Sequence, residues 1–211
     1  MRGFFITFEG ADGGGKTTQL RLAAEALRAQ GYEVVESREP GGTPLAEKVR
    51  ALVLDPQLPL TSTSQTLLYL AARSEHVDKV LRPALETGKI VLCDRFSDST
   101  LVYQGLAVGK KLGELGELRA LGDFATAGIK PDLTLVLDGD PELLATRREL
   151  RGVTDRYEEK GLEYQKILRQ GFLTLAKAEP VRMKVVNAEA DTASVAALIQ
   201  KEIAAFLAEA K

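Results

Sequence analysis

Residues 10–17 read GADGGGKT, and this stretch decides the fold. It matches the pattern G-x-x-x-x-G-K-[ST], which is informative only between a strand and a helix. Both flanks are present, because residues 4–8 form the apolar run FFITF and apolar residues recur at helical spacing from Leu20 to Leu27. Glycines let successive backbone N–H groups of such a loop point at a phosphate, beside the positive end of the following helix. The stretch therefore predicts a cradle for the phosphates of a nucleoside triphosphate.

Four further apolar segments predict the rest of a sheet. Residues 90–93 and 133–137 are nearly continuous apolar runs, as buried parallel strands are, and weaker strands are expected at 33–36 and 182–186. Helix-length segments separate all five strands. This alternation predicts an α/β fold of the P-loop NTPase type, a sandwich with a five-stranded parallel sheet flanked by helices. Ligands of such a sheet bind beyond the carboxyl ends of the strands.

Length and composition set further bounds on the chain. Its 211 residues, 45% of them apolar, suffice for one domain, residues 1–211. The arginine-rich interval 147–156 contains Gly152 and predicts a short mobile lid at about residues 146–157. The net charge of −2 argues against binding of long nucleic acid. The apolar runs are too short to span a membrane, so we expect no membrane contact. Cys93 has no disulfide partner in the chain, which favours a reducing compartment, and we expect a cytoplasmic protein.

Two residues of the loop and one strand end have expected roles around the donor. Lys16 is expected to bridge the β- and γ-phosphates, and Thr17 to bind Mg²⁺. Asp94 closes the strand 90–93, where P-loop proteins hold a carboxylate linked to Mg²⁺, partly through water. A helix N-cap or a turn is the alternative role for Asp94. Mg²⁺ is the cofactor that this chemistry implies, without a dedicated cage of protein ligands.

Four arginines indicate a second anion beside the donor. Arg38, Arg50, Arg73 and Arg95 lie at or beyond the expected strand ends or on the helices that follow them. A guanidinium fork matches a phosphate better than an ammonium does. Any one of these side chains could be a surface residue, but four so arranged predict an anion pocket.

Five segments together carry a resemblance to a known family. They are FEGADGGGKTTQ at 8–19, REPGGTPLAEKVR at 38–50, LLYLAARSEH at 67–76, DRFSDSTLVYQG at 94–105 and KPDLTLVLD at 130–138. In this order and spacing the chain resembles the bacterial thymidylate kinases over nearly its whole length. The resemblance implies transfer of the γ-phosphoryl group of ATP to dTMP, giving dTDP and ADP in dTTP biosynthesis. It also implies a homodimer, for which the apolar helices expected at 64–85 and 112–124 could supply the seam.

The resemblance implies a role for each residue near the reacting phosphates. Asp12 takes the place of the acidic residue that faces the phosphates or the sugar. Arg95 would clamp the acceptor phosphate close to the γ-phosphate, and Arg50 would hold it from the other side. Glu39 and Pro40 would line the nucleotide cleft. The residues implied to bind ATP are Gly10, Ala11, Asp12, Gly13, Gly14, Gly15, Lys16, Thr17, Thr18 and Arg147.

The resemblance also implies how the acceptor base and sugar are recognised. Tyr69 would stack on thymine, where the family usually has Phe, and Arg73, four residues later on the same helix face, would bond O4. Gln104 and Thr100 match positions that bond the thymine edge, and Tyr103 would crowd the 2′ position and favour deoxyribose. Tyr69 and Tyr103 could instead belong to the core, since buried aromatic side chains are common. The residues implied to bind dTMP are Glu39, Pro40, Arg50, Tyr69, Arg73, Arg95, Ser99, Thr100, Tyr103 and Gln104.

The phosphate loop has no arginine, whereas the interval 147–156 has four. This combination resembles the type of thymidylate kinase in which the lid supplies the catalytic arginine. Arg151, next to Gly152, is the first candidate and Arg147 the second, and a solvated basic helix end is the alternative. The implied catalytic residues are Lys16, Arg95, Arg151 and Asp12.

Two other functions stay open on the sequence alone. A kinase of the same architecture could use another acceptor, because the phosphate loop is generic. A nucleotide switch with little transfer is the other alternative, although no partner-facing segment stands out apart from the lid.

His76 lacks Cys or His companions at metal-ligand spacing, so it is expected to be structural or solvent-exposed. Spacing assigns no role to Tyr157 or Glu158.

Overall fold

The computed structural model describes residues 2–149, 157 and 160–210. Its five strands are parallel and lie in the order β2-β3-β1-β4-β5. The expected α/β sheet is therefore confirmed, with strand ends that differ from the expected ones by one or two residues. The strands are β1 Phe5–Glu9, β2 Val34–Arg38, β3 Ile90–Asp94, β4 Leu133–Asp138 and β5 Met183–Asn187.

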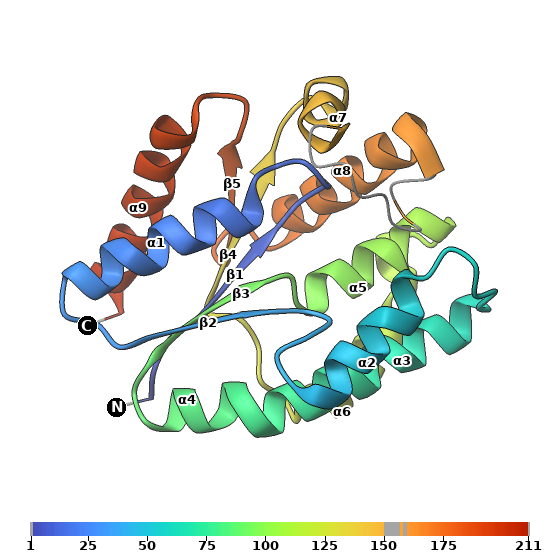
Figure 1. Cartoon of the computed structure of the whole chain (residues 1–211), viewed down its shortest axis with the longest axis horizontal. Helices are drawn as coiled ribbons and strands as arrows, with labels where there is room; N and C mark the ends of the chain where they lie inside the picture. Colours follow the sequence, from blue (N-terminus) through green and yellow to red (C-terminus); the bar gives the residue numbers. More distant parts are fainter. Residues whose placement is uncertain (1, 150–156, 158–159, 211) are drawn as a thin grey trace.

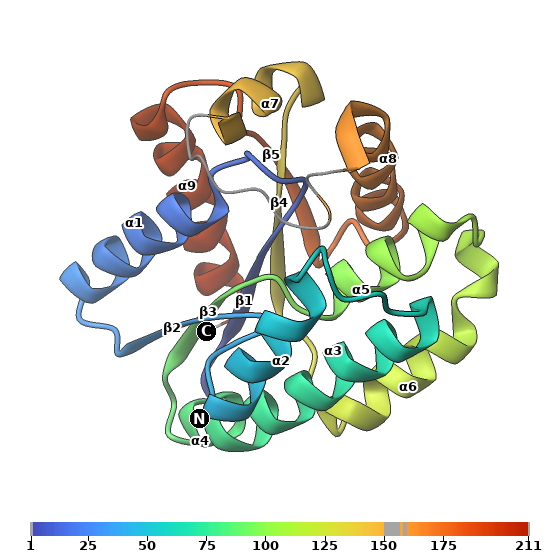
Figure 2. The same cartoon turned by 45° about the vertical axis from the view of Figure 1, so that its right-hand side comes forward.

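Helices cover both faces of this sheet. Helices α1 (Lys16–Ala29) and α9 (Thr192–Glu209) lie together on one face, and α4, α5 and α8 lie on the other (Figure 1). Figure 2 shows α2, α3 and α6 side by side at the outer edge of the second layer. The remaining helices are α2 Pro44–Leu54, α3 Ser62–His76, α4 Arg82–Glu86, α5 Ser97–Tyr103, α6 Gly116–Thr126, α7 Pro141–Glu149 and α8 Gly161–Ala178.

Apolar residues that face one another across the layers hold α1 on the sheet. Leu20 and Leu27 on α1 are buried in one cluster with Ile6 and Phe8 on β1 and with Ile199 on α9. Burial of each side chain of this size contributes roughly 1.5–3 kcal/mol relative to exposure. The helical spacing of the apolar residues after the phosphate loop is thus explained by a helix with one buried face.

Two expected helices are subdivided in the structure. The segment 64–85 is a regular α-helix only as far as His76, after which residues Val77–Leu81 form a π-helical turn that leads into α4. Pro83 lies in the first turn of α4, directly after this π-helical turn, and proline cannot donate a backbone hydrogen bond to the residues before it. The segment 112–124 begins with a 3₁₀ turn at Leu112–Glu114 before α6.

The sheet topology opens a crevice between β1 and β3. These neighbouring strands are followed by helices that go to opposite faces, α1 after β1 and α5 after β3. Such a switch point leaves a gap beyond the carboxyl ends of the strands, where α/β proteins bind ligands.

Among the residues that the structure describes, we find no helix with the length and apolar content needed to cross a membrane.

Candidate active site

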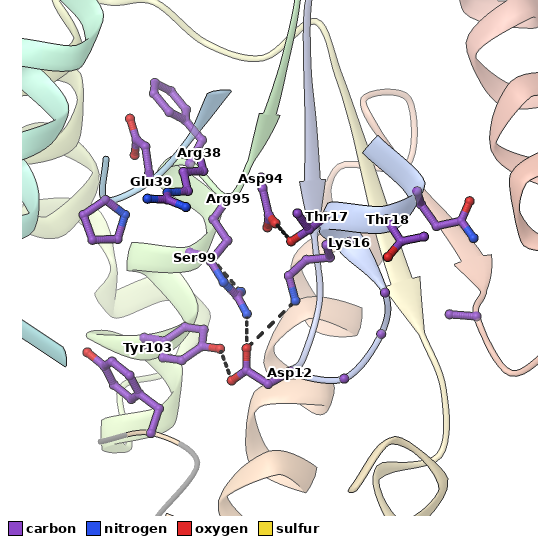
Figure 3. A pocket seen from close by; sticks show the side chains of 18 of the residues that line it. Asp12, Lys16, Thr17, Thr18, Arg38, Glu39, Asp94, Arg95, Ser99 and Tyr103 are labelled. Atoms are coloured by element: carbon purple, nitrogen blue, oxygen red, sulfur yellow. Dashed lines mark hydrogen bonds and ion pairs between the residues drawn. The ribbon is translucent and has the colours of Figure 1, made fainter. Parts of the chain in front are cut away.

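A cleft of about 730 Å³ lies at this switch point. The phosphate loop lines one end, and Tyr69, Arg73 and Gln104 line the other. Figure 3 shows the centre of the cleft, where side chains from the loop and from the segment after β3 point toward one another. The predicted donor and acceptor residues therefore share one continuous cavity.

The phosphate loop has the backbone that its glycines predict. Gly10 has a φ of 128°, and an added Cβ would lie 2.4 Å from the carbonyl oxygen of Leu137, so only glycine fits. Lys16 opens α1, and its Nζ donates to the carbonyl oxygens of Gly10 at 3.1 Å and Ala11 at 2.8 Å. Burial and the charge of Arg95 lower the pKa of this lysine to about 8. A bound phosphate would supply the negative charge that Lys16 now obtains only in part.

Thr17 and Asp94 form the expected pair beside the loop. The hydroxyl of Thr17 donates to Oδ2 of Asp94 at 2.6 Å, across the gap between α1 and β3 (Figure 3). A hydroxyl and a carboxylate are the hard oxygen donors that Mg²⁺ prefers. No group of three acidic, His or Cys side chains that could hold a metal occurs within residues 2–149, 157 and 160–210. The Thr17 hydroxyl and the Asp94 carboxylate fit Mg²⁺ as ligands.

Arg95 connects the segment after β3 to the phosphate loop. Its backbone is left-handed, with a φ of 71°, and its guanidinium donates to Asp12 Oδ1 at 2.6 Å and to the carbonyl oxygen of Gly10 at 3.0 Å. The hydroxyl of Tyr103 donates to the other carboxylate oxygen of Asp12 at 3.3 Å. Burial raises the pKa of Tyr103 well above its usual value, so this hydroxyl stays protonated. Ser99 accepts a further hydrogen bond from Arg95 at 3.2 Å.

Arg73 is held in place at the other end of the cleft. Its Nε donates to Glu39 at 2.7 Å, and its two terminal nitrogens donate to Thr100 Oγ1 and to the carbonyl oxygen of Phe96, both at 3.0 Å. The Arg73 side chain is only 3% exposed, yet it lines the cleft. Burial opposes ionisation of Glu39, but the charge of Arg73 and the hydrogen bond from His76 outweigh it and hold the pKa of Glu39 below its usual value.

Two further predicted arginines, Arg50 and Arg147, also border the cleft. Arg50 donates to the carbonyl oxygen of Pro40 at 3.0 Å, and both residues line the cavity. Arg147 lies on α7 at the rim, where its guanidinium donates to the carbonyl oxygens of Ala188 at 2.7 Å and Glu189 at 2.8 Å. Arg151 and most of the expected lid lie outside the described residues.

Tyr157 is a residue of the cleft to which the sequence assigned no role. Its ring is buried, and its hydroxyl accepts hydrogen bonds from Tyr69 at 3.1 Å and from Gln104 at 3.2 Å. The ring also lies edge-on to Tyr103, with centroids 4.9 Å apart. The sequence does show an aromatic residue directly after the arginine-rich interval. It could not show the hydrogen-bond partner of that residue, because Gln104 lies 53 positions earlier in the chain.

Glu9 is a second unexpected residue, because the sequence gives only its place at the end of a buried strand. Its carboxyl is fully buried and accepts from the backbone N–H of Phe96 at 2.8 Å and from the hydroxyl of Ser99 at 2.6 Å. Burial and the charge of Asp98 raise the pKa of Glu9 to about 7, against an opposing effect of Arg95.

His76 was expected to be either structural or solvent-exposed. Its side chain is buried, which agrees with the structural alternative.

The fold and this cleft define a nucleotide-binding protein of the P-loop class, with arginines lining the part of the cleft away from the phosphate loop. A family model described as Thymidylate kinase matches residues 8–199. The thymidylate kinase of Symbiobacterium thermophilum is 45% identical over 97% of this chain and 92% of its own length. That of Gluconobacter oxydans is 47% identical over 94% of each chain. A crystal structure of thymidylate kinase from Ehrlichia chaffeensis superposes with a TM-score of 0.77 at 36% identity, covering 96% of this chain and all of that one.

The chain belongs to the thymidylate kinase family, the kinases that phosphorylate dTMP to dTDP. Match lengths are nearly complete on both sides, so the similarity includes both ends of the cleft and not the phosphate loop alone. The resemblance drawn from five sequence segments is thereby confirmed at the level of family, fold and enzyme class.

Proposed function

We propose that this cleft binds ATP and dTMP end to end and transfers the γ-phosphoryl group of ATP to the 5′-phosphate of dTMP. The observation that carries this proposal is the ion pair between Arg95 and Asp12, with N–O 2.6 Å. Arg95 follows β3 and faces the acceptor end, whereas Asp12 belongs to the phosphate loop. One contact thus joins the two halves of the transfer reaction.

The donor half consists of the phosphate loop and the start of α1. Backbone N–H groups of the loop bind the β-phosphate, and Lys16 leaves the carbonyl oxygens of Gly10 and Ala11 to bridge the β- and γ-phosphates. Thr17 and Asp94 would hold Mg²⁺, in part through water. When bound, this ion neutralises charge on the transferred phosphoryl group.

The acceptor half uses the segments after β2 and β3 and the end of α3. Tyr69 stacks on thymine, and Arg73 and Gln104 bond its edge. The bond to Tyr157 uses one N–H of the Gln104 amide, so its second N–H and its carbonyl oxygen can serve the base while this bond holds the side chain in place. Tyr103 is fixed by Asp12 and packs beside the sugar, where it disfavours a 2′-hydroxyl. The acceptor phosphate lies between Arg95 and Arg50.

Phosphoryl transfer depends mainly on alignment and on cancellation of charge on the equatorial oxygens. Arg95 supplies part of this charge from the acceptor side. A lid at about residues 146–157 supplies the rest, with Arg151 as the first candidate and Arg147 as the second. Arg147 would have to leave the carbonyl oxygens of Ala188 and Glu189 to do so, which favours Arg151.

The proposal includes one domain per chain and a homodimer in the cytoplasm. Leu67 on α3 and Leu121 and Phe124 on α6 are exposed, and Phe124 has 87% of its surface open to solvent. These helices contact each other, so their apolar side chains share one outer surface suited to a second copy. Sedimentation equilibrium would give twice the mass of one chain, and Phe124→Asp would shift the protein toward monomer. A monomeric wild-type protein contradicts this part.

A panel of acceptors tests the proposed function most simply. With ATP and Mg²⁺, kcat/KM is measured for dTMP, dUMP, dCMP, dAMP, dGMP and for deoxynucleosides. The proposal predicts the highest value for dTMP. A preference of more than tenfold for another acceptor would show a kinase of different specificity. If no dTDP forms at any enzyme concentration, the alternative of a nucleotide switch is favoured.

A further inference from the structure

His76 occupies a position that the reaction described so far does not use. It is the only histidine of the chain and is completely buried at the end of α3, three residues after Arg73. Both ring nitrogens have partners: Nδ1 lies 2.9 Å from Oε1 of Glu39, and Nε2 lies 2.6 Å from Oγ of Ser37. Burial of an imidazole requires partners for both nitrogens, and here both partners belong to one segment, the end of β2 and the residue that follows it.

The carboxylate of Glu39 connects this imidazole to the cleft. Oε1 faces His76, and Oε2 accepts from Nε of Arg73 at 2.7 Å. An ionised carboxylate only accepts hydrogen bonds, so Nδ1 of His76 carries the proton and donates. In the neutral ring, Nε2 then accepts from the hydroxyl of Ser37. The result is a chain of hydrogen bonds from β2 through His76 and Glu39 to the arginine of the base pocket.

The loop after β2 is packed tightly on the same imidazole. Gly42 has a φ of 82°, and a Cβ added there would lie 2.8 Å from Cδ2 and 2.9 Å from Nε2 of His76. The ring therefore supports the loop that carries Glu39, in addition to bonding the Glu39 carboxylate. Arg73 in turn donates its Nε to Glu39, so this carboxylate is one of three acceptors that orient the guanidinium, beside Thr100 Oγ1 and the carbonyl oxygen of Phe96.

We propose that His76 is a positioning residue for acceptor recognition: through Glu39 it fixes the guanidinium of Arg73 against the acceptor base, without contacting any substrate. This inference rests on the proposed role of Arg73 in bonding the thymine edge. It goes beyond that role because it assigns acceptor affinity and base choice to a buried side chain outside the cleft. Loss of the imidazole frees Glu39 to turn, and Arg73 follows it.

Steady-state kinetics of four variants test this proposal. His76→Leu removes both hydrogen bonds, and His76→Asn keeps a donor near the position of Nδ1. Arg73→Gln tests the recipient of the effect. Thr7→Val is the matched control, because it deletes a buried hydrogen bond, from Thr7 to Thr134 at 2.7 Å, in the sheet and away from the base pocket.

The expected result is a selective change on the acceptor side. His76→Leu should raise the KM for dTMP about tenfold and reduce the preference for dTMP over dCMP, whose exocyclic amino group replaces the O4 that Arg73 reads. Its kcat and its KM for ATP should stay within about twofold of wild type. His76→Asn should recover much of the loss, and Thr7→Val should leave both KM values unchanged.

The outcomes separate this inference from the proposed function. Wild-type KM for dTMP and wild-type base preference in a folded His76→Leu protein overturn the role of His76, while transfer to dTMP by the wild type stands. Wild-type values in Arg73→Gln refute the base-reading role itself. If His76→Leu does not fold, NMR of the wild type decides: saturating dTMP should shift the imidazole nitrogen signals of the single histidine, and unchanged signals overturn the proposal.

Discussion

Nη2 of Arg95 lies 2.6 Å from Oδ1 of Asp12, and this ion pair connects the segment after β3 to the phosphate loop. Two short connections at neighbouring strand ends make the contact possible, because β1 and β3 pair in parallel register and their carboxyl ends lie side by side. In the absence of nucleotide the two charges cancel each other. Glu9 lies 3.9 Å from the same guanidinium. On the proposed function, a bound acceptor phosphate would add a further negative partner to an arginine that is already held in place, which is the preorganisation that favours catalysis.

Replacing Arg95 should therefore damage the acceptor side of the reaction. We expect Arg95→Ala to lower kcat/KM for dTMP by roughly 10²–10³-fold, the scale found when one preorganised charged donor is removed from an active site. The KM for ATP should change less than threefold. Initial rates with each substrate varied in turn give both values. Arg21→Ala, on the exposed face of α1, is the control that should behave as wild type.

Replacing Tyr69 separates stacking from hydrogen bonding. Tyr69→Phe keeps the ring and removes the hydroxyl, including its bond to Tyr157, so the KM for dTMP should stay within about threefold of wild type if stacking is the main role. Tyr69→Ala removes the stacking surface, which is worth roughly 1–3 kcal/mol per base, and should raise that KM about 10- to 100-fold. Equal effects of the two substitutions would mean that Tyr69 acts through its hydroxyl and not as a stacking ring.

Glu9 makes stability depend on pH. Its pKa rises from 4.5 to about 7 in the folded protein, so between these values the folded state keeps a proton that the unfolded state has released. The free energy of unfolding contributed by Glu9 is thus greatest below pH 4.5 and falls as pH rises through 7. Urea unfolding from pH 5 to 8 should show wild type losing stability relative to Glu9→Gln. A constant difference across this range would contradict the raised pKa.

ATP binding should be accompanied by proton uptake at alkaline pH. Burial and Arg95 lower the pKa of Lys16 to about 8, and contact with phosphates should return it toward 10.5, so the lysine takes up a proton on binding between these values. Calorimetric titration with ATP at pH 9 in two buffers of different ionisation enthalpy measures this uptake. Lys16→Arg, which stays protonated at this pH, should show none.

The lid prediction concerns the transition state. Arg151→Ala should lower kcat about 10³-fold, the smallest effect expected for an arginine that neutralises the transferred phosphoryl group, with far less loss of ATP affinity. Single-turnover rates and ATP titrations on the same preparation separate the two quantities. Arg147→Ala is the matched comparison, and a larger loss of kcat in that variant, or an unaffected Arg151→Ala, would move the role to another lid arginine.

Most of the fold could be predicted because it depends on local patterns. The glycines of residues 10–17 and the apolar runs at 90–93 and 133–137 each specify an element without reference to the rest of the chain. The break in the helix expected at 64–85 was missed, because its apolar pattern continues through the π-helical turn. Pro83 was the available sign of it, since proline has no backbone N–H to donate to the preceding turn of an uninterrupted helix.

The residues of the site also fall into two groups, those that a local motif predicts and those that depend on contacts between distant segments. Arg73 and Gln104 belong to recognisable motifs, and both line the cleft. Tyr157 bonds Gln104 directly, His76 reaches Arg73 only through Glu39, and Glu9 bonds the backbone N–H of Phe96 after β3. These hydrogen bonds join segments far apart in the sequence, and the residues next to each side chain do not indicate its partner. Such residues become visible only once the sheet has brought the segments together.

A crystal structure with dTMP and a non-hydrolysable ATP analogue tests the central claim most directly, because it shows both nucleotides at once. The account predicts thymine stacked on Tyr69 with its edge within hydrogen-bond distance of Arg73 and Gln104, and the acceptor phosphate beside Arg95, in line with the γ-phosphate on the loop 10–17. A thymine base bound elsewhere, with Arg73 still enclosed by Glu39 and Thr100 and out of reach of either nucleotide, would contradict it.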